Sequence, residues 1–93
     1  MLTQRYSSIV NNFNNYTYHI LGCGAIGSAA ATQIVRMGGE NLYFYDMDTV
    51  SEENLGVSQF RVSDLEQSKT KALRTICHAI NTNVTIGCVD GLF

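Results

Sequence analysis

The chain of 93 residues has no proline and no tryptophan, and only 15% of its residues are charged. It also has no run of about 18 apolar residues, the length that a membrane-spanning helix needs, so we expect no membrane partner. A net charge of −2 gives no general attraction to polyanions, and we therefore expect no nucleic-acid partner. The first six residues lack the apolar core of a signal peptide.

The three cysteines show no C-x-x-C spacing, so they indicate neither a disulfide framework nor a zinc site. We expect reduced thiols in a cytoplasmic protein and no metal-ligating residue. Hydrophobic residues make up 45% of the chain, which is typical of a globular protein. No repeat or linker divides the sequence, so we expect one domain over residues 1–93.

Residues 18–48 hold the most informative pattern in the sequence. This pattern predicts a strand, a glycine turn, a helix and a second strand, in that order. A strand expected over 16–21 runs into a G-x-G-x-x-G motif, which is followed by a small-residue helix expected over 28–37. The second strand, expected over 40–45, ends at Asp46, which lies 19 positions past the last glycine of the motif. A strand before the glycines, a helix after them and an acid at the next strand end are typical of a mononucleotide-binding βαβ unit.

Each part of this pattern has a physical role. Gly22 allows a tight turn, Gly24 lets backbone amides approach a phosphate, and Gly27 lets the helix pack close to the strand. The helix N-terminus offers unpaired amides to an anion, and Asp46 can accept hydrogen bonds from ribose hydroxyls. The alternative is a glycine-rich turn in an α/β domain that binds no nucleotide.

The remaining elements complete a β-α-β-α-β order. A short amphipathic helix is expected over 3–10, a longer helix over 68–80 and a third strand over 84–89. Right-handed crossovers then predict the fold class: α/β, a three-layer Rossmann-like half domain whose parallel sheet has the order 3-2-1 with flanking helices. Between the second strand and the long helix, the S-x-x-E run of 63–66 predicts a capping box for a short turn.

Four further segments carry a family resemblance. Residues 46–55 match D-x-D-x-V-x-x-x-N-L, 64–72 resemble D-x-G-x-x-K-A, 80–84 resemble I-N-P-x-V, and Arg5-Tyr6 resembles an opening Arg-Tyr pair. At these spacings the chain resembles the ThiF/MoeB/HesA adenylyltransferases, which are bacterial relatives of the ubiquitin-activating enzymes. The resemblance covers nearly the whole chain.

The resemblance implies that the chain binds ATP with Mg²⁺ and belongs to an enzyme that adenylates the C-terminal carboxylate of a ubiquitin-like or sulfur-carrier protein. It implies that Lys71 is the catalytic residue that neutralises the phosphates, whereas Lys69 is expected at the surface. Phosphoryl and nucleotidyl transfer need positive charge on phosphate oxygens more than an acid or base. The implied cofactor-binding residues are Gly22, Cys23, Gly24, Ala25, Ile26, Gly27, Asp46, Asp48, Asn54, Gln59 and Lys71.

Simpler roles remain open for three of these residues. Asp48 and Asn54 could cap the loop after the second strand, and Lys71 could be a solvated charge on the first turns of its helix. For the whole chain, two other functions also remain open. The glycine motif and Asp46 suit an NAD(P)-binding half domain of an oxidoreductase, and the fold could equally serve a non-catalytic interaction module.

The chain departs from the family pattern where the arginines should lie. No arginine follows Asn54-Leu55, Arg61 is displaced by two positions, and Ser8 stands where a second arginine is expected. The magnesium-binding aspartate of the family's fourth strand is also missing, so whether the chain is itself an enzyme stays open. We therefore expect a truncated domain that is inactive alone. Without that strand, Ile20 and Leu21 would lie at an open sheet edge, and such an edge predicts a homo-oligomer.

Overall fold

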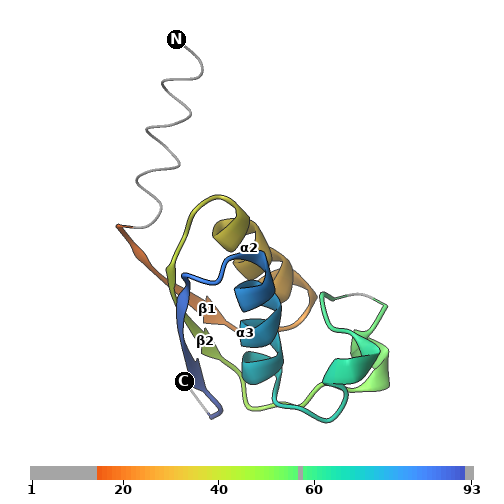
Figure 1. Cartoon of the computed structure of the whole chain (residues 1–93). Helices are drawn as coiled ribbons and strands as arrows, with labels where there is room; N and C mark the ends of the chain where they lie inside the picture. The colour runs from red at the N-terminus through yellow and green to blue at the C-terminus, as the bar shows by residue number, and fades with distance from the viewer. Residues whose placement is uncertain (1–14, 57, 92–93) are drawn as a thin grey trace.

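The computed structural model describes residues 15–56 and 58–91. Its sheet has three parallel strands, β1 (Thr17–Leu21), β2 (Asn41–Tyr45) and β3 (Thr85–Val89), with β2 in the centre (Figure 1). This β1-β2-β3 arrangement is the predicted 3-2-1 order, and the α/β fold class is confirmed. The helix expected over 3–10 lies outside the described residues.

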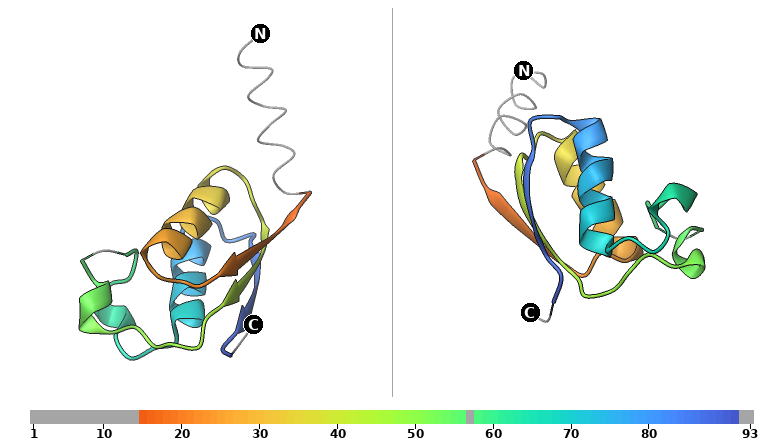
Figure 2. Two further views of the ribbon diagram at one scale, coloured as in Figure 1. Left: turned by 180° about the vertical axis from the view of Figure 1, so that it is seen from behind. Right: turned by 60° about the horizontal axis from the view of Figure 1, so that its bottom comes forward.

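Helices α2 (Ala25–Arg36) and α3 (Lys69–Ile80) lie side by side on one face of the sheet (Figure 2). Both β-α-β connections cross the sheet in the same direction. Because such connections are right-handed, both helices lie on the same face of the sheet. Among residues 15–56 and 58–91 the helices and the sheet therefore form two layers. The opposite face of the sheet is the one that a third layer would cover.

A long connection between β2 and α3 contains two short 3₁₀ helices, η1 (Glu52–Asn54) and η2 (Val62–Asp64). The capping box that we predicted from the S-x-x-E run is wrong in register. The structure forms it two residues earlier, with Arg61 as the N-cap and the Asp64 carboxylate accepting the Arg61 backbone N–H at 2.8 Å. The Asp64 carboxylate thus makes the hydrogen bond to the N-cap residue that we had expected Glu66 to make.

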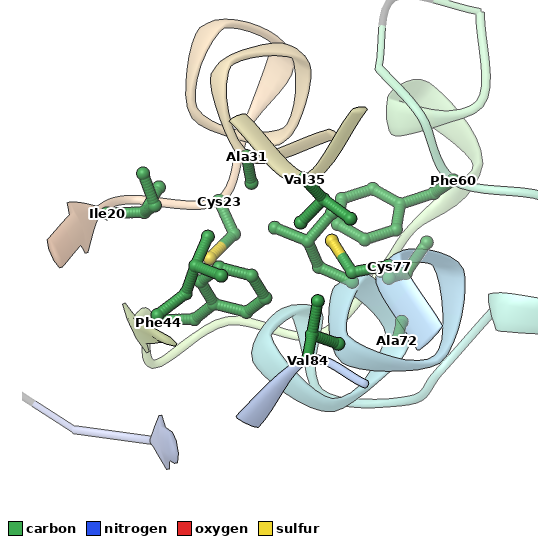
Figure 3. Close-up of a cluster of buried hydrophobic side chains, with 12 residues drawn as sticks. Ile20, Cys23, Ala31, Val35, Phe44, Phe60, Ala72, Cys77 and Val84 are labelled. Atoms are coloured by element: carbon green, nitrogen blue, oxygen red, sulfur yellow. The ribbon is translucent and has the colours of Figure 1, made fainter. Parts of the chain in front are cut away.

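The core lies between the two helices and the sheet (Figure 3). Leu42 and Phe44 of β2 point into it and are almost fully buried, whereas Tyr43 between them is exposed on the other face. This alternation follows from the two-residue period of a strand. Small side chains on the facing helices, Ala31 and Ala72, are fully buried and let the helices approach closely.

The face of the sheet opposite the two helices carries a row of cross-strand neighbours. His19, Tyr43 and Gly87 are in register, and the rings of His19 and Tyr43 stack with centroids 5.3 Å apart. A Cβ at position 87 would lie 2.5 Å from two ring atoms of Tyr43, so glycine lets this ring lie across the sheet. The Tyr45 hydroxyl and His19 Nδ1 are hydrogen-bonded at 2.7 Å.

Candidate nucleotide site

The glycine turn is shaped by two close backbone approaches. Gly22 has φ +95°, a conformation that glycine adopts at little cost, and its N–H donates to the Tyr45 carbonyl at 2.8 Å. A Cβ on Gly27 would lie only 1.8 Å from the Gly22 carbonyl oxygen. The turn therefore joins the end of β1 both to α2 and to the end of β2.

Asp46 lies against this turn. One carboxylate oxygen accepts the Cys23 backbone N–H at 2.8 Å, and the other accepts the Asp48 backbone N–H at 2.9 Å. The acid that follows β2 is thus held beside the glycine turn by charge-assisted hydrogen bonds. Asp46 is only partly buried, so part of the residue is accessible from solvent.

The N-terminus of α2 is open toward solvent. Gly24 is its N-cap, no side chain caps it, and a Cβ on Gly24 would meet no atom within 4 Å. A shallow cavity of about 540 Å³ lies here, lined by His19–Gly22 and Gly24–Gly27. Ala25 and Ile26 line this cavity and are themselves exposed. Helix amides without protein partners are suited to binding an anion.

A second, polar cavity of about 290 Å³ lies beside the first turn of α3. Asp48, Thr49, Ser51, Glu53, Asn54 and Lys69 line it. The Lys69 backbone N–H donates to the Asp48 carbonyl at 3.0 Å, which fixes the start of α3 against the segment after β2. This cavity gathers two carboxylates, an amide and an ammonium group at the carboxyl edge of the sheet.

The charge of Lys69 also reaches the glycine turn. Burial, and to a lesser extent the Asp46 carboxylate, raise the pKa of the Cys23 thiol to about 12, and the Lys69 ammonium opposes this rise. Lys69 is therefore electrostatically coupled to the residue whose amide binds Asp46. The Cys23 thiol itself stays protonated near neutral pH, which is not the state of a nucleophile.

Lys71 lies elsewhere. Its Nζ is 3.7 Å from a carboxylate oxygen of Asp90, and its side chain is 59% exposed. Two residues along a helix are about 200° apart around its axis, so Lys69 and Lys71 face different sides. The structure thus brings Lys69, rather than Lys71, together with Asp48 and Asn54. The phosphate role of Lys71 stays a prediction, and Lys69 joins the candidate site as a residue that sequence reasoning missed.

A signal for Lys69 is present in the sequence. Counting the D-x-G-x-x-K pattern from Asp64 places its glycine on Glu66 and its lysine on Lys69. The backbone of Glu66 has φ 69°, in the left-handed region that favours glycine. The conformation of Glu66 supports this register over the one that ends at Lys71.

Asn54 and Gln59 occupy the flanks of the site. The Asn54 side-chain oxygen accepts the Ser51 backbone N–H at 2.8 Å and the Ser51 hydroxyl at 3.1 Å, so its loop-capping role is observed. The Gln59 backbone N–H donates to the Ser28 hydroxyl at 3.4 Å, which places Gln59 beside the first turns of α2. Both predicted residues therefore lie in the same region as the turn and the polar cavity.

The Arg61 guanidinium is paired with the Asp64 carboxylate. Its Nε and Nη2 donate to the two carboxylate oxygens of Asp64 at 3.2 and 3.3 Å, and the Asp64 side chain is only 3% exposed. This two-pronged pair anchors η2. Within the part of the chain that the structure describes, no group of three His, Cys, Asp or Glu side chains is placed to hold a metal ion by itself. In that same part, no helix is long and apolar enough to cross a membrane.

With a glycine turn at the end of the first strand and an acid at the end of the second, this chain has a Rossmann-like fold, a class that is common among nucleotide-binding proteins. Comparison with known proteins narrows the class. The model of the ThiF family matches residues 7–92, and the chain belongs to the ThiF family. The predicted family resemblance is confirmed.

The curated relatives are activating enzymes. The chain is 36% identical over 81 residues to ubiquitin-like modifier-activating enzyme 5 of Oryza sativa subsp. japonica, covering 84% of this chain and 19% of the relative. It is 38% identical over 79 residues to the enzyme of the same name from Dictyostelium discoideum, covering 82% of this chain and 21% of the relative. The chain thus spans about a fifth of the length of these relatives.

Solved structures share the fold. E. coli MccB with ATP superposes with a TM-score of 0.85 at 21% identity, covering 90% of this chain and 26% of MccB. E. coli TcdA, a tRNA N6-threonylcarbamoyladenosine dehydratase solved in complex with ATP, superposes with a TM-score of 0.86 at 22% identity, covering 91% and 35%. At this level of identity the likeness establishes the fold alone.

Proposed function

We propose that this chain binds ATP, as the nucleotide-binding part of an enzyme that adenylates the C-terminal carboxylate of a ubiquitin-like or sulfur-carrier protein. The observation that carries the proposal is the Cys23 N–H to Asp46 hydrogen bond, which holds the acid against the glycine turn beside the open N-terminus of α2. Membership of the ThiF family and the ATP complexes of MccB and TcdA support it.

We assign each group a role in this reaction. The ribose hydroxyls bind Asp46, and the phosphates lie against the amides of the turn and the first turn of α2. The carrier carboxylate oxygen forms a bond to the α-phosphorus as the bond to the β-phosphate oxygen breaks and pyrophosphate leaves. Lys69 neutralises the charge that develops on the phosphate oxygens.

The residues present fit Mg²⁺ only together with a nucleotide. Mg²⁺ is usually held by one or two carboxylates, with phosphate oxygens and water completing its shell. Asp48 and Glu53 line the polar cavity and would supply those carboxylates. When bound, the ion would add positive charge beside the triphosphate.

We expect nucleotide binding without turnover from this chain alone. Arg61, the cation nearest in sequence to the expected phosphate clamp, is paired with Asp64. Lys69 is then the cation that the described residues bring to the polar cavity. A single lysine binds a triphosphate but leaves much of the transition-state charge uncompensated.

A calorimetric titration with ATP and Mg²⁺, repeated with NAD⁺, tests this function. We expect ATP to bind and NAD⁺ to bind more weakly. Lys69→Ala should weaken ATP binding about tenfold, as expected for one lost charge-assisted contact. Lys71→Ala is the matched control, since it removes the same charge from the same helical turn, and should change the affinity less than twofold.

The other outcomes are equally informative. Selective NAD⁺ binding would support the oxidoreductase half domain, and binding of neither nucleotide by a folded chain would support an interaction module. A larger effect of Lys71→Ala than of Lys69→Ala would restore Lys71 to the phosphate site.

We further propose that the chain acts in the cytoplasm and self-associates through the outer edge of β1, which pairs with no strand among residues 15–56 and 58–91. Leu21 at this edge and Ile26 of α2 are 63% and 87% exposed, whereas Ile20, which we also expected at the edge, is buried in the core. Exposed apolar strand edges favour pairing. Cys23, Cys77 and Cys88 are free thiols, which suits a reducing compartment. Sedimentation velocity over a wide concentration range should show a dimer or larger species, and a monomer throughout would contradict self-association.

A further inference from the structure

A cluster of polar side chains joins the end of β3 to the first turn of α3. One oxygen of the Asp90 carboxylate accepts the Thr70 hydroxyl, and the other lies 3.7 Å from Lys71 Nζ. Thr70 is fully buried, and its hydroxyl is satisfied internally: it donates to Asp90 and lies 3.4 Å from the Ser68 hydroxyl. None of these contacts belongs to the nucleotide site described above.

Thr70 lies between the two lysines in sequence, and its contact sets where each lysine points. Successive helical residues are about 100° apart, so the lysines project to opposite sides of the buried threonine. With Thr70 held by Asp90, Lys69 is directed toward Asp48 and Lys71 toward Asp90 itself. The Lys69 backbone N–H to the Asp48 carbonyl, at 3.0 Å, completes the anchorage of this turn.

We propose that Asp90 is a positioning residue for the nucleotide site. It binds the Thr70 hydroxyl and thereby fixes the rotation of the first turn of α3, so that Lys69 faces the phosphates and Lys71 is kept out. The role in nucleotide binding rests on the proposed function, whereas the anchoring of Lys69 is a property of the chain itself.

The two contacts of Asp90 can be separated by substitution. An asparagine keeps an oxygen that accepts the Thr70 hydroxyl but loses the charge that attracts Lys71. An alanine loses both contacts. If the hydrogen bond sets the rotation of the turn, Asp90→Asn should behave like the unchanged chain and Asp90→Ala should not.

Two measurements on the full chain test the proposal. The first is hydrogen exchange of the Lys69 backbone amide by NMR, which requires no nucleotide. The second is the ratio of ATP to adenosine affinity, which isolates the phosphate contacts from the rest of the site. Asp90→Ala should speed exchange of the Lys69 amide about tenfold and lower the affinity ratio about tenfold, the size expected for one lost charge-assisted contact. Asp90→Asn should change either quantity less than twofold.

Thr70→Val removes the hydroxyl while leaving Asp90 in place, and it should reproduce the effects of Asp90→Ala. Combining the two substitutions should add nothing further, because both remove one hydrogen bond. If Asp90→Ala does not fold, Thr70→Val alone carries the test.

Unchanged exchange of the Lys69 amide in these variants would overturn the proposal. So would an equal loss of ATP and adenosine affinity, which indicates general structural damage. If the unchanged chain binds neither ligand, the proposed function fails, and the exchange measurement still decides whether Asp90 anchors Lys69.

Discussion

The two ends of the candidate site are built by different means. At the glycine-turn end, backbone contacts set the geometry: Gly22 donates to the Tyr45 carbonyl, and Gly27 lets α2 approach the turn. At the lysine end, side chains set it, through the Arg61–Asp64 pair and the Thr70–Asp90 hydrogen bond. A site that is built from backbone contacts needs glycine at fixed positions, so it leaves a recognisable motif in the sequence. A site that is built from side-chain contacts can be formed by several combinations of residues.

The largest effect should come from Gly27→Ala at the glycine-turn end. Its Cβ would lie 1.8 Å from the Gly22 carbonyl oxygen, so the helix or the turn must move. We expect a loss of about 4 kcal/mol or more in the free energy of unfolding, measured by urea denaturation. Gly24→Ala is the control, because its Cβ meets no atom within 4 Å, and it should cost less than about 1 kcal/mol.

At the lysine end, Asp64→Ala should destabilise the chain by about 2–3 kcal/mol. The substitution leaves the Arg61 backbone N–H and guanidinium without the carboxylate that now accepts from them. Urea denaturation of this variant should be compared with Glu52→Ala, which removes an exposed carboxylate nearby. Equal stabilities of the two variants would show that the lysine end does not depend on this buried pair.

Alkaline pH should weaken the fold through two buried thiols, Cys23 in the glycine turn and Cys77 in α3. Burial raises the pKa of Cys23 and of Cys77 from an ordinary 9.0 to about 12. The unfolded chain therefore loses these protons first, so the stability they contribute is complete below about pH 9 and is lost as pH rises toward 12.

Between pH 8 and 9.5 we expect the two thiols to lower the free energy of unfolding by about 1–2 kcal/mol in total. Denaturation with and without Cys77→Ala measures this, and the variant should show about half of the thiol-dependent decrease. Alkylation of Cys23 or Cys77 in the folded chain as fast as half-buried Cys88 would contradict the assignment.

The smallest effect should be a gain in stability. Glu66 holds φ 69°, and Glu66→Gly removes this strain at a modest cost in unfolded-chain entropy. We expect a net gain of about 0.5–1 kcal/mol, measured as a rise in the thermal midpoint. Glu66→Ala keeps the strain and should give no gain; an equal gain would mean that the charge, rather than the backbone, is responsible.

Most of the fold could be predicted from local patterns. The three strands begin one residue later than expected, and α3 begins at Lys69 rather than Ser68, because Ser68 is its N-cap and accepts the Lys71 backbone N–H. The larger difference is α2, which begins at Ala25 rather than Ser28. Since Gly24 acts as the N-cap, the helix starts inside the glycine motif, although glycine has a low helix propensity.

The lysine end of the candidate site was harder to predict from the sequence than the glycine-turn end. Asp46 could be placed because strand ends of a parallel sheet meet at one edge. The choice between Lys69 and Lys71 depends on helix rotation, which Thr70 and Asp90 set from 20 residues apart in sequence. Glu66 also made the D-x-G-x-x-K motif hard to align, because glutamate stands at the glycine position of the motif while its backbone keeps the left-handed conformation that favours glycine.

The row of His19, Tyr43 and Gly87 has an optical consequence. The chain has five tyrosines and no tryptophan, so tyrosine supplies its near-ultraviolet absorption and emission. Tyr43 stacks on His19 of the neighbouring strand, and the Tyr45 hydroxyl is bonded to the same imidazole. Separation of β1 from β2 would therefore change the tyrosine spectrum directly, and Gly87→Ala, which displaces the Tyr43 ring, would change it without altering the glycine turn. The molecule carries its own chromophore for following whether these two strands remain paired.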